Sequence, residues 1–150
     1  MSTEETTVGE MLTASVPMVR TLGIEYLETT AEHAVLSLPD RPEYQNHVGG
    51  PHAGAMFTLA ESASGAVVLA AFGDQLARAV PLPVSTQMSF KKVARGPLTA
   101  SATLGRPVAD VIAELDAGTR PEFPVAVEIR REDGAVTSEM SVVWTLRPHG

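Results

Sequence analysis

Cysteine is absent from the 150 residues of the chain. Its absence excludes disulfide bonds, thiolate-ligated metal sites and a cysteine nucleophile, and it fits a reducing compartment, where structural disulfides are rare. Stability must therefore come from packing. Hydrophobic residues make up 44% of the chain, and a domain of this length buries roughly 70% of its unfolded surface without covalent staples.

Basic residues are also scarce, because 11 Lys and Arg against 18 Asp and Glu give a net charge of −7. A domain of that sign is a poor partner for nucleic acid, so no nucleic-acid binding is expected. Residues 1–10 lack both the basic and the apolar region of a secretory signal. We therefore expect a cytoplasmic protein.

The chain length indicates a single domain over residues 1–150, because one ordinary domain has about 100 to 200 residues. Residues 1–8 are polar and acidic and are expected to form a loose N-terminal tail. A rough helical pattern of apolar residues follows from Glu10 to Leu22 and is interrupted by Pro17. We expect a short helix there that ends near Gly23.

The first half of the domain is predicted to contain a hairpin, a long loop and a buried helix. Ile24–Thr29 and His33–Leu38 are apolar-rich and joined by a short polar segment, which indicates a β-hairpin. Pro39–Pro51 is rich in Pro, Gly and Asn, and a loop of that length is uncommon without a function. Ala53–Phe72 is apolar on nearly every side, which indicates a buried helix. Its central carboxylate, Glu61, and the lack of a basic flank argue against a membrane span.

The second half alternates between apolar and polar residues with the period of two that is typical of strands with one buried face. Such runs cover residues 84–91, 98–104, 125–130 and 136–146, with a hairpin turn at Asp133-Gly134 and a short helix over residues 107–118. Antiparallel strands that bury one face can wrap that face around a single helix. The pattern therefore predicts an α+β protein with the hotdog fold, an antiparallel β-sheet wrapped around one long buried helix.

One segment carries a motif that spans a loop, a helix start and a helix middle: Asn46, Gly49, His52-Ala53-Gly54 and Glu61. It resembles the active-site segment of PaaI-like acyl-CoA thioesterases and of the DUF4442 family of hotdog proteins. In that pattern an Asn precedes a Gly, His-Gly-Gly or a close variant opens the buried helix, and an Asp or Glu lies near its middle. The resemblance covers residues 24–147 in element order and residues 46–65 in motif. It implies hydrolysis of an acyl-CoA thioester, with coenzyme A as part of the substrate and no separate cofactor.

Glu61 is the residue on which the implied chemistry depends. A carboxylate within an apolar helix loses hydration, which raises its pKa, and perturbed carboxylates are concentrated at functional sites. A Glu that is satisfied by an internal partner, or that faces a subunit interface, is the structural alternative. In a thioesterase Glu61 would act as general base toward water or as nucleophile toward the acyl carbon. The sequence leaves both roles open.

Gly54 lies in the first turn of the same helix, where backbone N–H groups lack helical partners and face the positive end of the helix dipole. Such an N–H can hold the oxyanion that forms from a thioester carbonyl, although tight packing is another reason for a glycine. Gly54 and Glu61 are separated by about 10.5 Å along a helix, which is long for one carbonyl to touch both groups. We therefore expect a homodimer with shared active sites, and the resemblance implies a dimer or a tetramer of dimers.

Asn46 and His52 are the remaining candidate catalytic residues. The Asn46 amide can orient water or the Glu61 carboxylate, or it can only shape a turn. His52 can hydrogen-bond the thioester region or serve as a structural histidine of the loop. His47 and His52 are five residues apart, which is not the spacing of a helical zinc site, so no metal is expected.

Lys91, Lys92 and Arg95 form the densest basic cluster of this acidic chain. The family carries basic residues in this region, where they meet the phosphates of coenzyme A, and Lys and Arg suit phosphate groups. A charged strand end that discourages edge-to-edge association is the alternative reason for the cluster.

Two departures from the family pattern keep other functions under consideration. Pro83 stands where several relatives carry a Ser or Thr that positions water, a role that Ser85 or Thr86 could take, and Ala53 replaces the first Gly of the usual pair. A hotdog dehydratase or hydratase, which pairs a loop His such as His47 with a helix acid, is one alternative. A non-catalytic acyl-binding module is another. Small helix residues and few aromatics are compatible with a medium or bulky acyl chain, either fatty acyl or arylacetyl.

Overall fold

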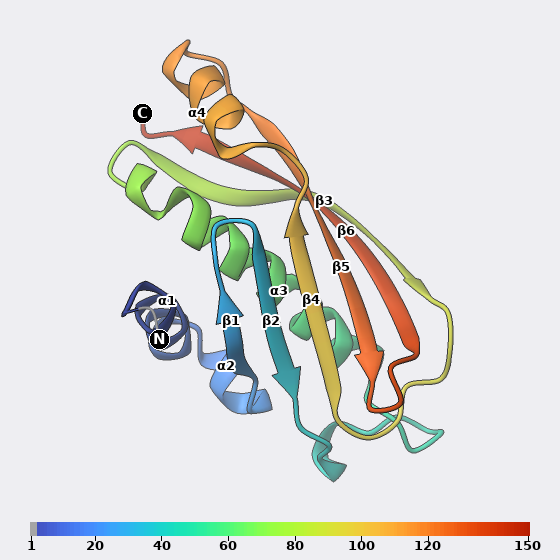
Figure 1. Cartoon of the computed structure of the whole chain (residues 1–150). Coiled ribbons are helices and arrows are strands. Elements are labelled where there is room, and N and C mark those ends of the chain that lie inside the picture. Colours follow the sequence, from blue (N-terminus) through green and yellow to red (C-terminus); the bar gives the residue numbers. More distant parts are fainter. Residues whose placement is uncertain (1–2) are drawn as a thin grey trace.

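A six-stranded antiparallel sheet wraps around one long helix in the computed structural model, which describes residues 3–150 (Figure 1). The strands lie in the order β1-β2-β4-β5-β6-β3, so β1 and β3 form the two edges. The α+β prediction is therefore confirmed. In chain order the helices and strands are α1 (Thr3–Ser15), α2 (Pro17–Leu22), β1 (Glu25–Thr29), β2 (His33–Leu38), α3 (Ala53–Phe72), β3 (Ala79–Phe90), β4 (Leu98–Leu104), α4 (Val108–Asp116), β5 (Glu122–Arg131) and β6 (Val136–Pro148).

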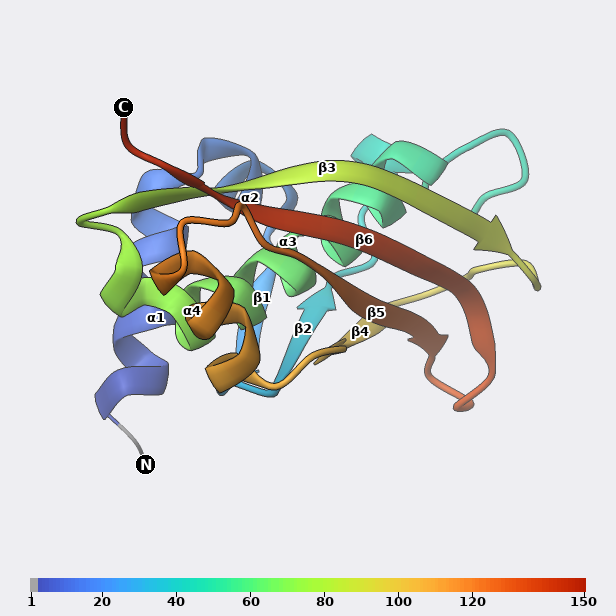
Figure 2. The same ribbon diagram turned by 90° about the horizontal axis from the view of Figure 1, so that it is seen from above.

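Helix α3 forms the centre of the core, and Figure 2 shows the sheet curving around it. It spans the residues predicted for the buried helix, and eleven of its 20 residues are buried. Its many small side chains let β2, β4 and β5 pack closely against it. The helix is long and apolar enough to cross a membrane by length and composition alone. Here the sheet covers it, so its place in the core accounts for its apolar character.

Strand β3 differs from its prediction in length and in burial. It begins at Ala79, before Pro81 and Pro83, because an edge strand tolerates prolines that lack a backbone N–H for a neighbouring strand. The alternating pattern predicts one buried face, yet Val84 is 48% exposed and Phe90 is 56% exposed. That part of the prediction is wrong for the isolated chain, since neither face of the outer half of β3 is buried against the described residues.

The N-terminal segment is helical where the sequence predicts a loose tail. The tail was expected over residues 1–8, but α1 already begins at Thr3, and residues 1–2 lie outside the described part of the chain. Helix α1 packs against β1 and α3, and such packing supplies most of the stability of helices in proteins. Gly9 allows close approach, because a Cβ at that position would lie 3.1 Å from the Cβ of Tyr26.

The short helix expected from Glu10 to Leu22 is divided into the end of α1 and the whole of α2. Pro17 occupies the first turn of α2, where its missing N–H has no helical partner to lose. Gly23 ends α2 with a φ of 71°, a left-handed conformation that favours glycine. The stop predicted at Gly23 is therefore confirmed.

A chain of hydrogen bonds ties β6 to α3 beside Glu61. Nε1 of Trp144 donates to Oγ of Ser64 at 3.1 Å, and the Ser64 hydroxyl donates to the backbone carbonyl of Glu61 at 2.7 Å. Trp144 is 7% exposed and Ser64 is fully buried. Water therefore has little access to either group, and the Trp144 N–H depends on Ser64 for its acceptor.

Replacing Ser64 with Ala removes that acceptor. We expect Ser64→Ala to lower the free energy of unfolding by about 1–3 kcal/mol, which is the cost of an unsatisfied buried donor. Urea denaturation measures this change. Ser62→Ala is the matched control, because the Ser62 hydroxyl makes no hydrogen bond within residues 3–150, and its effect should stay within about 0.5 kcal/mol. Equal stability of the two variants would contradict this account.

Candidate active site

Glu61 lies in the middle of α3 and faces a cavity of about 240 Å³. Its carboxylate is half-buried and accepts no hydrogen bond from the part of the chain that the structure describes. The loss of hydration on burial raises the pKa of Glu61 above its ordinary value of 4.5. No internal donor or cation offsets this cost, so the described residues do not support the alternative of a Glu satisfied by an internal partner.

Tyr26, on β1, lines the same cavity as Glu61. Burial, and secondarily the negative charge of Glu61, raises the pKa of Tyr26 to about 12. The phenol therefore keeps its proton at physiological pH and remains a hydrogen-bond donor in the cavity. Sequence analysis missed Tyr26. Its position in the hairpin before the motif was the only signal, and a short strand does not reveal which of its side chains turn toward a distant helix.

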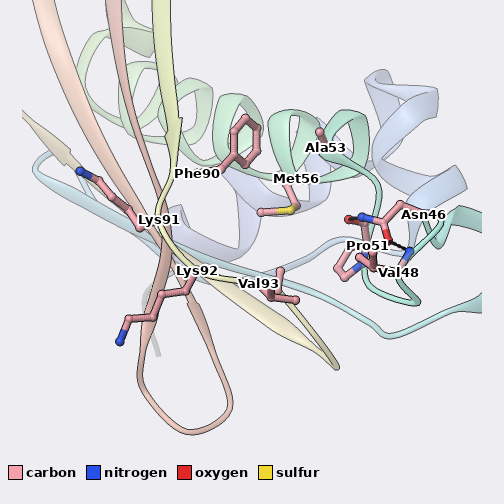
Figure 3. A pocket seen from close by; sticks show the side chains of 10 residues that line it. Asn46, Val48, Pro51, Ala53, Met56, Phe90, Lys91, Lys92 and Val93 are labelled. Atoms are coloured by element: carbon pink, nitrogen blue, oxygen red, sulfur yellow. Dashed lines mark hydrogen bonds between the residues drawn. The ribbon is translucent and has the colours of Figure 1, made fainter.

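The loop that leads into α3 is folded by Asn46. Its Oδ1 accepts the N–H of Val48 at 3.0 Å and the N–H of Gly50 at 3.1 Å, and its Nδ2 donates to the Pro51 carbonyl at 3.3 Å. Figure 3 shows Asn46 beside Val48 and Pro51 at one end of a second cavity. A Cβ at Gly50 would collide with the carbonyl oxygen of Ala94. The geometry therefore gives Asn46 the turn-shaping role.

His52 caps the start of α3. Its Nδ1 accepts the N–H of Gly54 at 2.9 Å, so the backbone donor predicted at Gly54 already has an acceptor. The N–H of Ala53 donates to no group among residues 3–150. Ala53 also lines the second cavity, which has a volume of about 450 Å³. The N–H of Ala55 likewise has no acceptor among the described residues, but Ala55 does not line this cavity. The unpartnered donor that borders the cavity is thus one residue before the position predicted from the sequence.

The basic cluster lies beside this second cavity. Lys91 and Lys92 line it, and Figure 3 shows their side chains extending outward from it. Nζ of Lys91 pairs with Glu139 at 3.2 Å on the surface. Nη1 of Arg95 donates to the Val48 carbonyl at 3.1 Å, so Arg95 braces the loop that Asn46 folds. The two lysines are the cations that face outward from the cavity rim.

The candidate residues, to which the structure adds Ala53, form two groups within one chain. Asn46, Ala53 and the two lysines surround the second cavity, whereas Glu61 faces the first. Ala53 and Glu61 are separated by about 12 Å along α3. His47 is exposed and lines neither cavity. Among the side chains that the structure describes, no group of three His, Asp or Glu residues could hold a metal ion.

The antiparallel sheet around a single helix, with polar groups at the start and middle of that helix, defines a hotdog-fold protein. The chain belongs to the family described as domain of unknown function DUF4442, whose model matches residues 5–146. No curated protein sequence matches the chain. The resemblance inferred from the motif is therefore confirmed at the level of family and fold.

Solved structures share this fold over most of the chain. A Pseudomonas aeruginosa protein of unknown function, described as a probable thioesterase, is 25% identical, with a TM-score of 0.86 over 99% of this chain and 97% of that one. A Chlorobaculum tepidum protein of unknown function is 10% identical, with a TM-score of 0.85 over 97% and 94%. A variant of a Staphylococcus aureus thioesterase enzyme is 16% identical, with a TM-score of 0.71 over 89% and 100%. These likenesses give the fold, and function must be argued from the residues.

The loop geometry predicts how Asn46 variants behave. Asn46→Ala leaves two backbone N–H groups without their acceptor, so we expect it to lower the free energy of unfolding by about 1–2 kcal/mol. Asn46→Asp keeps the acceptor oxygen for both N–H groups but loses the Nδ2 donor to the Pro51 carbonyl, so it should also be destabilised, though less than Asn46→Ala. Urea denaturation of both variants tests the assignment. A stability of Asn46→Ala equal to that of the wild type would show that the amide does not hold the loop.

Proposed function

We propose that the protein is a thioesterase that hydrolyses acyl-CoA to a free acid and coenzyme A. The observation that carries the proposal is Glu61, a half-buried carboxylate that accepts no hydrogen bond from the described residues and has a raised pKa beside a cavity. Carboxylates in that state are concentrated at catalytic sites. Two of the similar structures are described as a probable thioesterase and a thioesterase enzyme, which supports the same class of reaction.

In the proposed reaction, ionised Glu61 takes a proton from a water molecule while the water oxygen attacks the thioester carbonyl carbon. Negative charge develops on the former carbonyl oxygen, and the N–H of Ala53, at the positive end of α3, stabilises it. The carbon–sulfur bond then breaks, and the coenzyme A thiolate leaves and regains a proton. Direct attack by the carboxylate, followed by hydrolysis of the resulting anhydride, gives the same products. Lys91 and Lys92 bind the phosphates of coenzyme A.

Each active site is built from two chains in this proposal. Ala53 and Glu61 face separate cavities, and their separation along α3 is too long for one carbonyl to reach both. The edge strand β3 is hydrogen-bonded to another strand on one side only and exposes Val84 and Phe90. Pairing of β3 with the β3 of a second copy would cover this edge. The resulting homodimer combines Ala53 of one protomer with Glu61 of the other, and two dimers can assemble into a tetramer.

Release of free thiol from a panel of acyl-CoAs tests the reaction and the role of Glu61. Only the ionised carboxylate can act, so kcat should rise with pH through the Glu61 pKa, which burial places above 4.5. Glu61→Gln should remove this limb of the pH profile and lower kcat by about 10²–10⁴-fold. Wild-type turnover in the variant would refute the proposed role.

The same variant should be more stable than the wild type at neutral pH, which separates loss of activity from unfolding. Because the folded pKa of Glu61 is raised, the folded state binds its proton more tightly than the unfolded state does. Its contribution is fully favourable below the unfolded pKa and is lost as the pH rises through the folded pKa. The gain from Glu61→Gln should therefore grow between about pH 4 and pH 8. Denaturation at both pH values measures it.

Ala53→Pro tests the backbone donor without removing a side-chain group. Proline is favourable at the first helical position, and His52, with φ −61° and ψ 145°, already has a conformation suited to the residue before a proline. The variant should keep its helix content but lose about 10²–10³-fold in kcat, as expected for one lost oxyanion donor. Ala53→Ser, which keeps the N–H, is the matched control.

Mixing the two inactive variants tests the shared site. Refolding Ala53→Pro together with Glu61→Gln should restore about a quarter of the wild-type rate, because half of the dimers are mixed and each mixed dimer has one intact site. Restoration is impossible if both groups act within one chain. An active protein that sediments strictly as a monomer would also exclude the shared site.

The assay distinguishes the other functions considered from the sequence. Tight binding of acyl-CoA without thiol release would indicate a binding module, and hydration of an enoyl-CoA would indicate a hydratase. The exposed position of His47, outside the Glu61 cavity, provides no support for the histidine–acid pair of a hydratase within one chain.

A further inference from the structure

The cavity beside Glu61 has a wall that comes from the N-terminal helix, and this wall bears on substrate choice. We propose that the cavity is the subsite for the acyl group, and that Leu12 of α1 and Val16, which lies between α1 and α2, limit it to acyl groups of about eight to ten carbons. The inference rests on the proposed thioesterase function and adds a substrate class to it. Medium-chain fatty acyl groups and an arylacetyl group both have this size.

The chemistry of the lining fits an acyl group with its thioester at one end. The polar side chains of the cavity are Glu61, Tyr26 and Ser62. The other lining residues are apolar or glycine: Leu12, Val16, Val19, Gly65, Val68, Leu69, Pro81 and Trp144. Such a surface recognises a hydrocarbon by burial. The reacting carbonyl would lie at the carboxylate, and the chain would extend away from it.

The lining residues of α3 give the cavity a direction. Glu61, Gly65 and Leu69 are spaced by four residues and therefore share one face of the helix. This face runs for about 12 Å from the carboxylate toward the end of the helix. Figure 1 shows α1 on the side of α3 that the main sheet leaves uncovered, and α1 packs against α3 and β1. Helix α1 therefore covers the groove along α3.

Gly65 keeps the middle of this groove open. A glycine in the interior of a helix is unfavourable compared with alanine, and Gly65 has no positive φ that would require it. A Cβ at this position would make only ordinary contacts, 3.8 Å from two ring atoms of Trp144. Close packing therefore does not demand a glycine here. Its effect is to leave α3 without a side chain where it borders the cavity beside Trp144, so the cavity is not narrowed at this point.

The volume of the cavity sets the size of the acyl group. An apolar cavity of about 150 Å³ accommodates benzene, with six carbons. By the same scale the space of about 240 Å³ holds about ten carbons. A long fatty acyl chain would have to displace α1. Val16, between α1 and α2, is 37% exposed, and Leu12 of α1 is only partly buried. These two side chains therefore form a thin wall that determines where the cavity ends.

A chain-length series with variants of α1 and α3 tests the inference. Wild-type kcat/KM should rise by about fourfold for each methylene group that enters the cavity, reach a maximum near octanoyl- to decanoyl-CoA, and fall at least tenfold by palmitoyl-CoA. Leu12→Ala should move the maximum by about two to three carbons toward longer chains, because it removes three carbons from the wall. Met11→Ala is the matched control, since Met11 is 42% exposed on the same helix and does not line the cavity.

The opposite change narrows the cavity from the other side. Gly65→Leu should lower kcat/KM for octanoyl-CoA at least tenfold more than for acetyl-CoA, with helix content checked by circular dichroism. A profile that is flat from butanoyl- to palmitoyl-CoA, or a Leu12→Ala profile equal to that of the wild type, would overturn the inference while leaving thioesterase activity intact.

A binding measurement keeps the subsite testable if no thioester is hydrolysed. S-Octyl-coenzyme A, a thioether that cannot be hydrolysed, should bind the wild type at least tenfold more tightly than coenzyme A does in calorimetry. Gly65→Leu should remove this preference. Equal affinity of the thioether and coenzyme A for the wild type would overturn the subsite, whereas a preference for the thioether without any turnover would overturn only the catalytic function.

Discussion

The cost of taking one carboxylate out of water is the constraint on which the rest of this molecule depends. Glu61 is the only ionisable side chain of a helix that a sheet surrounds, and isolated charges in apolar surroundings are expensive. None of the described residues forms an ion pair with its carboxylate or donates a hydrogen bond to it. The cost is offset by the packing of the whole helix, because eleven residues of α3 are buried. A large apolar core therefore holds one poorly solvated base, and water or substrate is left as its partner.

The start of α3 illustrates the opposite condition, in which nearly every polar group is satisfied. Asn46 holds the preceding loop through three hydrogen bonds. Arg95, in the segment between β3 and β4, donates a further hydrogen bond to that loop. His52 caps the helix. The N–H groups of Ala53 and Ala55 have no acceptor among the described residues, and of the two only Ala53 lines the neighbouring cavity. A rigid helix thus carries an available donor at one end and an available base in its middle, and the distance between them is fixed by helix geometry. This fixed distance is the physical reason for assigning the site to two chains.

Local patterns predict most of the fold and part of the site. The bounds of α3 follow from an uninterrupted apolar segment after a loop rich in Pro and Gly, and Glu61 is identified because it is the one charge within it. The burial of β3 does not follow, since alternation does not distinguish a face that is covered within one chain from a face that a second copy would cover in the proposed dimer. The shift from Gly54 to Ala53 was not predictable either, because it depends on the rotamer with which His52 turns Nδ1 toward a neighbouring N–H. The part of α1 that precedes Glu10 was missed, and so was Tyr26, because both depend on tertiary contacts around Gly9.

Trp144 makes the Glu61 cavity observable by intrinsic fluorescence. It is the only tryptophan of the chain, its indole N–H is hydrogen-bonded to α3, and its ring borders the Glu61 cavity. The emission of an indole responds to the polarity and hydrogen bonding around it, so the intrinsic fluorescence of the unlabelled protein reports on this one cavity. Entry of an apolar group beside the ring would displace water and shift the emission spectrum, whereas a ligand confined to the lysine rim would leave it unchanged. The chain thereby contains a built-in optical reporter at the place where its chemistry is proposed to occur.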